Sequence, residues 1–203
     1  MLRPATPLAE CPRAPRYRRW WLRQQAIGWH WLRRDRRALA AWLRLHQVAP
    51  HDSAVAASIG HLLACLSRPA EAHPWLEAAT RLAPRSAASW FNRGFVELQL
   101  GDHRAAVESF ERAIAHDQGL DRAHYGLGMS LVALGRDEAA LASFARNAEL
   151  QPLSPFGWYQ LGHVQHRLGR AAELQRTIRR LAGFEPQVAR QLSRETGRPT
   201  EGS

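Results

Sequence analysis

Residues 121–154 read DRAHYGLGMSLVALGRDEAALASFARNAELQPLS, and this stretch decides the fold. Its apolar side chains recur with the 3.6-residue period of an α-helix in two segments, which Gly135 and Arg136 separate. Pro152 follows the second segment, where proline commonly ends a helix. The stretch therefore predicts two antiparallel helices joined by a short turn.

The same pattern recurs along the chain at a fixed period, the spacing that separates Gly94 from Gly128. One set of glycines lies inside the first helix of each unit, and we name Gly94, Gly128 and Gly162 the crossing glycines. A second set lies between the two helices, and we name Gly101, Gly135 and Gly169 the turn glycines. The other recurring positions are Phe110 and Phe144, the small residues Ala106 and Ala140, Trp90 and Trp158 two periods apart, and Pro84, Pro152 and Pro186. A period of this length is typical of solenoid proteins.

The two glycine sets have different expected roles. A turn glycine is expected where a helix ends in a left-handed conformation that costs glycine little. A crossing glycine costs its helix about 1 kcal/mol relative to alanine. That cost is explained if the partner helix crosses there at close range, with the recurring phenylalanine filling the wedge between units.

These residues resemble the tetratricopeptide repeat family, whose pattern is W-x2-L-G-x2-Y, then A-x3-F, then P within a unit of the same period. Residues 121–154 match it through Leu127, Gly128, Ala140, Phe144 and Pro152. Residues 87–120 depart from it at Arg93, where the pattern has leucine. The resemblance implies an all-α, right-handed superhelical solenoid of antiparallel helix pairs.

Stepping by one period at a time divides the chain into five expected units. Their bounds are 19–52, 53–86, 87–120, 121–154 and 155–188, followed by a capping helix over 188–197. Ser67 takes the place of a turn glycine, and Pro74 predicts a kink or a late start in the second helix of its unit. Residues 1–18, a basic tail, and residues 198–203 are expected to be disordered.

The first unit begins RWWLRQQAIGWHWLRRDRR (19–37), a stretch rich in tryptophan and arginine. We expect one side of its first helix to pack around Trp42 through Leu22, Ala26 and Trp29. The opposite side is expected to place Trp20, Ile27 and Trp31 at the mouth of a groove. The turn between the helices is expected to hold Arg33, Arg34, Arg36 and Arg37.

The charge of the chain is uneven. The formal net charge is +10, all 28 basic residues are arginine, and residues 1–50 alone carry a net charge of +9. A lysine-free chain suggests a GC-rich bacterial genome. Cys11 and Cys65 are the only cysteines, which favours a reducing compartment. The opening residues lack the apolar core of a signal peptide and no apolar run is long enough to cross a membrane, so we expect a cytoplasmic protein.

No catalytic constellation stands out, and we expect neither an enzyme nor a cofactor or metal. The chain has no glycine-rich phosphate loop followed by lysine and no HExxH motif. His163 and His166 are spaced to share a metal, but two polar residues lining a groove are the favoured interpretation. Cys65 lies in an apolar segment that predicts a buried and unreactive thiol.

Stacked helix pairs offer instead a concave groove, lined mostly by the first helices. A helical wheel predicts an aromatic groove with arginine and histidine at its ends and no acid on that face. The residues assigned to it are Trp20, Arg23, Ile27, Trp31, His61, Phe91, Asn92, Phe95, Gln99, Arg122, Tyr125, Met129, Phe156, Tyr159, His163, His166 and Arg167, with His30, Ala57 and Ala64 beside them. The alternative is that some of these aromatic side chains pack against neighbouring helices.

The favoured function is a non-enzymatic scaffold or adaptor that binds an extended or helical protein segment with apolar and acidic groups. Some family members bind chaperone tails through a basic and amide clamp. Here only Asn92 and Arg122 fall at such places, so the co-chaperone-like clamp is incomplete and we do not infer a chaperone tail as the ligand. Two alternatives use the first unit, namely nucleic-acid binding and peripheral attachment to a membrane. Nucleic acid is disfavoured because the body of the chain is slightly acidic, and self-association stays open.

Overall fold

The computed structural model describes residues 16–198, and every helix or strand assigned in that range is an α-helix. The helices are α1 (Arg16–Trp31), α2 (Asp35–Val48), α3 (Ser53–Cys65), α4 (Pro69–Leu82), α5 (Ala87–Gln99), α6 (His103–His116), α7 (Asp121–Ala133), α8 (Asp137–Leu150), α9 (Pro155–Arg167), α10 (Ala171–Ala182) and α11 (Pro186–Thr196). The expected tails over 1–15 and 199–203 lie outside the described residues.

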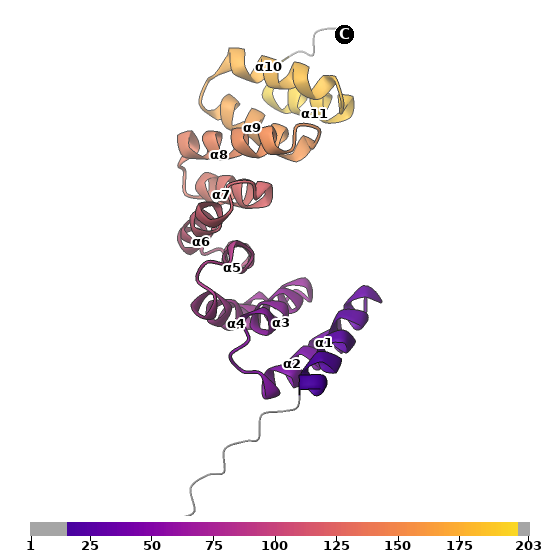
Figure 1. Cartoon of the computed structure of the whole chain (residues 1–203). Helices are drawn as coiled ribbons and strands as arrows, with labels where there is room; N and C mark the ends of the chain where they lie inside the picture. Colours follow the sequence, from indigo (N-terminus) through magenta and orange to yellow (C-terminus); the bar gives the residue numbers. More distant parts are fainter. Residues whose placement is uncertain (1–15, 199–203) are drawn as a thin grey trace, which may run out of the picture.

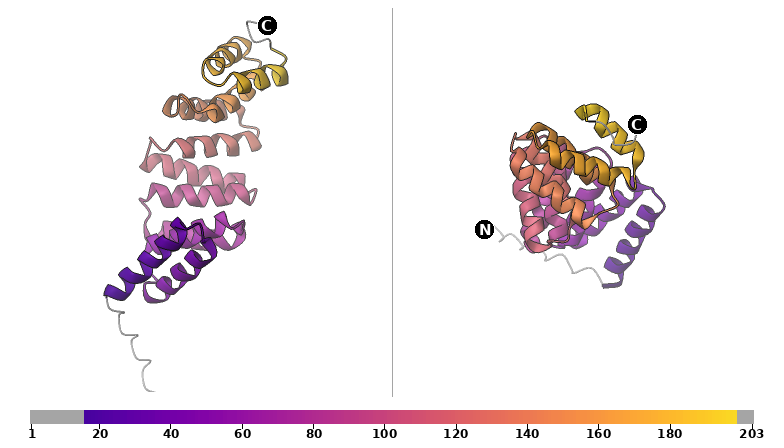
Figure 2. Two further views of the ribbon diagram at one scale, coloured as in Figure 1. Left: turned by 90° about the vertical axis from the view of Figure 1, so that its right-hand side faces the viewer. Right: turned by 90° about the horizontal axis from the view of Figure 1, so that it is seen from above.

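Consecutive helices pack as antiparallel pairs and the pairs stack into an elongated array (Figure 1). The left view of Figure 2 shows the same stacking, with α1 (indigo) and α11 (yellow) at opposite ends. Alternate helices also touch, because α3 contacts α5 and α5 contacts α7. The all-α solenoid of helix pairs is therefore confirmed. The last helix, α11, has no partner of its own and packs on both α9 and α10.

The crossing glycines lie where a side chain of a neighbouring helix approaches the backbone closely. A Cβ atom added to Gly128 would lie 2.7 Å from the ring of Phe144, which is fully buried. A Cβ atom on Gly162 would lie 2.5 Å from Leu192 of α11. The expected close crossing is confirmed, and at the end of the array α11 supplies the side chain that fills the space.

A left-handed residue ends the first helix of all five units. The turn glycines have φ values of +77°, +70° and +69° in chain order, as expected. The same phase of the repeat holds Ser67 with φ +58° and Arg33 with φ +55°. The backbone of the turn thus keeps its shape through the array even where the sequence has no glycine, and the two L-residues adopt a strained conformation.

Ser67→Gly is expected to raise the free energy of unfolding by about 1 kcal/mol, because glycine adopts a positive φ without the strain of a Cβ atom. The reciprocal control is Gly101→Ser, which introduces the strain at a position where no heavy atom lies within 4 Å of the new Cβ. It should lower stability by a similar amount. Urea denaturation followed by circular dichroism measures both, and shifts of the same sign would contradict the prediction.

The first unit differs in part from its expected arrangement. Ala26 is fully buried, and Leu22 and Trp29 pack in the cluster that contains Trp42, which confirms the predicted contact side. However, α1 begins at Arg16, so residues 16–18 belong to a helix rather than to a tail. The turn is also shorter than expected, since α2 begins at Asp35 and holds Arg36 and Arg37 in its first turn.

Pro74 does not delay α4. The helix begins at Pro69 and continues through Pro74 to Leu82, so the late start predicted from this proline is wrong. Both Pro74 and Ala70, whose carbonyl loses its helical partner, are exposed. This exposed side of α4 tolerates the carbonyl that proline deprives of a donor, because such a group can be solvated there.

Candidate functional site

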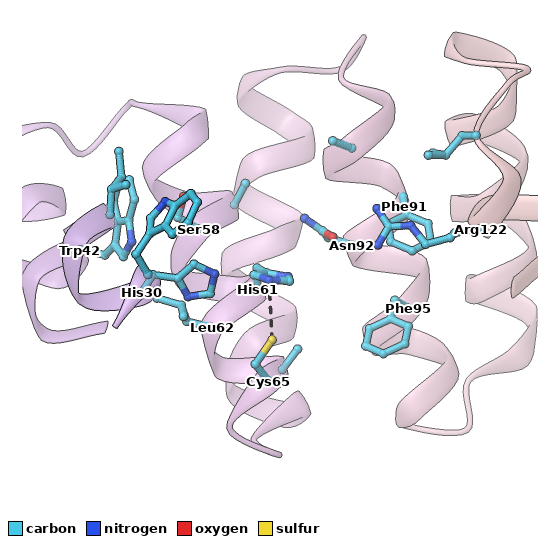
Figure 3. A pocket seen from close by; sticks show the side chains of 16 residues that line it. His30, Trp42, Ser58, His61, Leu62, Cys65, Phe91, Asn92, Phe95 and Arg122 are labelled. Carbon is cyan, nitrogen blue, oxygen red and sulfur yellow. Dashed lines mark hydrogen bonds between the residues drawn. The ribbon is translucent and has the colours of Figure 1, made fainter. Parts of the chain in front are cut away.

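A groove of about 640 Å³ runs across the first helices of four units, α1, α3, α5 and α7. Figure 3 shows its lining as a row that passes from Trp42 and His30, over His61 and Cys65, to Phe91, Phe95 and Arg122. The predicted site residues that the structure brings together here are Ile27, Trp31, His61, Phe91, Asn92, Phe95 and Arg122, together with His30, Ala57 and Ala64.

The middle of the groove is polar but uncharged. Burial lowers the pKa of His61, and the positive charges of His30 and Arg122 lower it further. Cys65 lies beside it, with its Sγ atom 3.6 Å from Nε2 of His61. Burial, followed by the charge of Asp35, raises the pKa of the Cys65 thiol. Near neutral pH both groups therefore lack charge, and this part of the groove suits uncharged ligand groups.

The prediction that Cys65 is buried is wrong. Its side chain is exposed and lines the groove. The error arises because Cys65 lies one turn after His61 on the side of α3 that lines the open groove. The apolar run around it reflects the contacts of Leu62 and Leu63 with the core rather than burial of the whole segment.

One end of the groove combines two aromatic rings with a cation. The rings of Phe91 and Phe95 are stacked with their centroids 6.4 Å apart. The guanidinium carbon of Arg122 lies 4.9 Å from the centroid of Phe91, which is a cation–π contact. Phe95 is 42% exposed, so it offers apolar area to a ligand. No aspartate or glutamate lies among the residues that line this groove.

Sequence reasoning missed several lining residues. Trp42, around which the first helix is expected to pack, is buried and still presents an edge to the groove. Ser58, Leu62 and Cys65 continue the stripe of His61 at helical spacing, so a wider arc on the wheel would have included them. The remaining unpredicted members are Ala88 and Leu120.

Three predicted residues at the edges lie outside the groove. Trp20 is about two turns away from Ile27 along α1 and is 62% exposed. Arg23 donates from Nη2 to Oδ2 of Asp52 at 2.8 Å, which ties α1 to the start of α3. Gln99 is exposed at the last residue of α5.

Tyr125 and Met129 serve packing rather than the groove. Both lie partly buried against the cluster that contains Phe144, and the rings of Tyr125 and Phe144 meet edge to face at 5.7 Å. The alternative interpretation, that predicted groove residues pack against a neighbouring helix, therefore holds for Tyr125 and Met129.

The last unit faces α11 instead of an open groove. The hydroxyl of Tyr159 donates to Oε2 of Glu195 at 2.6 Å, and Nε2 of His163 lies 3.0 Å from the same oxygen. Burial and this hydrogen bond raise the pKa of Tyr159 to about 12. Hydrogen bonds from Tyr159 and then Gln191 lower the pKa of Glu195. The expectation of no acid on this face is therefore wrong, because α11 brings one that the helical wheel of α9 could not show.

The other residues of that unit are separate from one another. Arg167 donates to Asp137 at 2.6 Å, while Phe156 and His166 are exposed. Since His163 faces Glu195, the histidine pair stays outside the groove. Within residues 16–198, no three His, Cys, Asp or Glu residues are grouped so that they could hold a metal. None of the helices in that range has the length and apolar character needed to cross a membrane.

Known proteins resemble the centre of the chain in sequence. The family model described as tetratricopeptide repeat matches residues 58–119 and 96–157. Residues 58–157 therefore match the tetratricopeptide repeat family. Superkiller complex protein 3 of Mus musculus is 32% identical over 100 residues, and that of Homo sapiens is 28% identical over 102 residues. Each match covers 48% of this chain but only 6% of the relative, so the likeness concerns the repeats alone.

Solved tetratricopeptide repeat structures match the fold over most of the chain. MamA superposes with a TM-score of 0.76 at 17% identity, covering 85% of this chain and 94% of MamA. YrrB, which is described as a TPR protein with an unusual peptide-binding site, superposes with a TM-score of 0.72 at 19% identity. That match covers 83% of this chain and 88% of YrrB. At these identities the likeness establishes the fold of the repeats.

Proposed function

We propose that this chain is a non-enzymatic scaffold that binds a segment of another protein in the groove across α1, α3, α5 and α7. Tetratricopeptide repeats form protein-interaction scaffolds, and the YrrB structure is described as holding a peptide-binding site. The observation that carries the proposal is the exposed aromatic lining around Phe91 and Phe95 beside Arg122, with no acid in the groove.

The chemistry of the lining defines the segment that would fit. Apolar side chains of the segment would rest on Phe95 and on the ring edges of Trp31 and Trp42. A carboxylate would lie against Arg122, whose charge no lining acid neutralises. The neutral His61 and the amide of Asn92 offer hydrogen bonds to the backbone between these points. An extended or helical segment with apolar and acidic groups is the proposed partner.

Phe95→Ala is expected to weaken binding of such segments about thirtyfold, the effect of losing an aromatic anchor. Peptides would be selected from a displayed random library on the wild-type protein, and their affinities measured by fluorescence anisotropy. Phe156→Ala is the matched control, because Phe156 is 69% exposed but lies outside the groove. Equal affinities for wild type and Phe95→Ala, with both folded, would remove the groove assignment.

We further propose a bacterial origin and a cytoplasmic location. The lysine-free composition supports the first, and the presence of only two cysteines supports the second.

A further inference from the structure

The outer face of α1 carries a row of exposed apolar side chains that is separate from its packing side. Tyr17, Trp20, Trp21 and Trp31 are 74%, 62%, 54% and 83% exposed, and Ile27 lies between them along the helix. Their spacing of three and four residues places them on one side of the helix. The opposite side buries Ala26 and packs on α2, so the row contributes little to the fold.

The indole N–H groups of this row have no partner among residues 16–198. By contrast, Nε1 of Trp90 donates to the carbonyl of Pro84 at 2.8 Å, and Nε1 of Trp158 donates to that of Pro152 at 3.2 Å. Those two tryptophans serve the repeat. The row on α1 instead presents apolar rings with free donors, which is the arrangement that tryptophan takes at a membrane–water interface.

Arginines lie at both ends of the row. Arg16, Arg18 and Arg19 are exposed at the start of α1, and Arg33, Arg34, Arg36 and Arg37 surround the turn to α2. Within residues 16–198 none of these seven forms an ion pair with an acid. The turn arginines line a shallow hollow of about 340 Å³ together with Asp35 and Leu66. A net positive charge therefore flanks the apolar row at each end.

The middle of the row has no free cation. Arg23 is the arginine nearest to the middle, and Asp52 engages it in an ion pair. Gln24, Ile27 and Gly28 face outward between the aromatic ends. The row from Tyr17 to Trp31 extends about 21 Å at the rise of an α-helix. A nucleic-acid strand would call for cations along such a length to follow its phosphates. A bilayer requires an apolar centre with cations at the edges.

We propose that the outer face of α1, with the arginines of the α1–α2 turn, is a docking surface for an anionic lipid bilayer. The helix would lie in the plane of the interface, with Trp20 and Trp21 among the headgroups and acyl boundary and the arginines on lipid phosphates. This surface shares Ile27 and Trp31 with the groove but goes beyond it, because Tyr17, Trp20 and Trp21 do not line the groove. A peptide bound in the groove would then be held at a membrane.

The test is co-sedimentation of the full chain with vesicles of phosphatidylcholine alone or mixed with phosphatidylglycerol. Binding is expected only with the anionic vesicles and should weaken as salt is added. Trp20→Ala with Trp21→Ala, and separately Arg33→Gln with Arg34→Gln, should each lower the partition coefficient about tenfold. Circular dichroism of each variant confirms that it is folded.

Matched controls are available at distant positions. Leu153→Ala with Phe156→Ala removes two side chains that are 71% and 69% exposed at another turn, and Arg104→Gln with Arg112→Gln removes two exposed charges of α6. Both control pairs should bind vesicles like the wild type.

Absence of binding to anionic vesicles, or equal loss in the controls, would overturn the proposal. If the protein binds a single-stranded oligonucleotide but no vesicles, the proposal is overturned in favour of a nucleic-acid-binding surface. Groove variants such as Phe95→Ala keep vesicle binding, so the two proposals fail separately.

Discussion

Phe110→Ala is expected to lower the free energy of unfolding by about 3–5 kcal/mol. Phe110 is 1% exposed and lies between two first helices of neighbouring units. A Cβ atom on Gly94 of α5 would be 3.0 Å from its ring, and one on Gly126 of α7 would be 2.4 Å away. Truncation would leave a cavity that the glycines on either side cannot fill, because they have no side chains to move into it.

Urea denaturation of the wild type and variant measures this loss. Phe156→Ala is the control, because its ring is 69% exposed and its removal should change stability by less than about 0.5 kcal/mol. A loss below about 1 kcal/mol for Phe110→Ala would show that the units do not depend on this wedge.

Arg93→Met is expected to lower the free energy of unfolding by about 3–5 kcal/mol, because it leaves a buried carboxylate without its counterion. Glu97 is 1% exposed, and its Oε1 accepts from Nε of Arg93 at 2.7 Å. His73 lies 3.4 Å from the same oxygen, and the hydroxyl of Ser109 donates to Oε2 at 2.6 Å. Without Arg93, only His73 and Ser109 would stabilise the carboxylate of Glu97, and both are weaker partners than an arginine. This pair also explains why residues 87–120 have arginine where the repeat pattern has leucine.

The last unit has an uncharged version of this hydrogen-bond network at the equivalent positions. Two periods later, Gln165 accepts a hydrogen bond from the hydroxyl of Thr177 at 2.8 Å, in the places of Glu97 and Ser109. A neutral amide is thus compatible with the same site. Arg93→Met combined with Glu97→Gln is therefore expected to recover most of the stability, to within about 1 kcal/mol of the wild type. A double variant no more stable than Arg93→Met alone would contradict the account.

Much of the fold could be predicted because each unit repeats the same local rules. The crossing glycines and the buried phenylalanines recur at one spacing. The structure places Gly94 against Phe110 and Gly128 against Phe144, as expected, whereas Gly162 lies against Leu192 of α11. Ser67 lies at the same position of its unit as the turn glycines and has a positive φ like them. The turn must keep its shape there for the next helix to pack. Periodicity reports contacts that every unit shares, which is why these positions could be identified without a structure.

The candidate site was less predictable, because it lies on the side of each helix that the repeat leaves unconstrained. Ile27, His61 and Phe95 do meet in one groove. Tyr125 instead turns onto Phe144, although its wheel position is similar. The spacing of residues gives the side of the helix but not the rotamer of a side chain, so it does not distinguish these outcomes.

The sequence by itself determined the helix pairs, their turns and the side of each helix that is buried, because these depend on contacts that recur in every unit. Only the tertiary structure decided how far the groove extends. The groove ends at Arg122, because Tyr125 and Met129 further along α7 pack against the cluster that contains Phe144. In the last unit, Glu195 of α11 lies against Tyr159 and His163. The tertiary structure also decided that the outer face of α1, the first helix of the described residues 16–198, is exposed. The ends of a solenoid lack the neighbour that the repeat assumes, so their exposure follows from the assembled array rather than from the period.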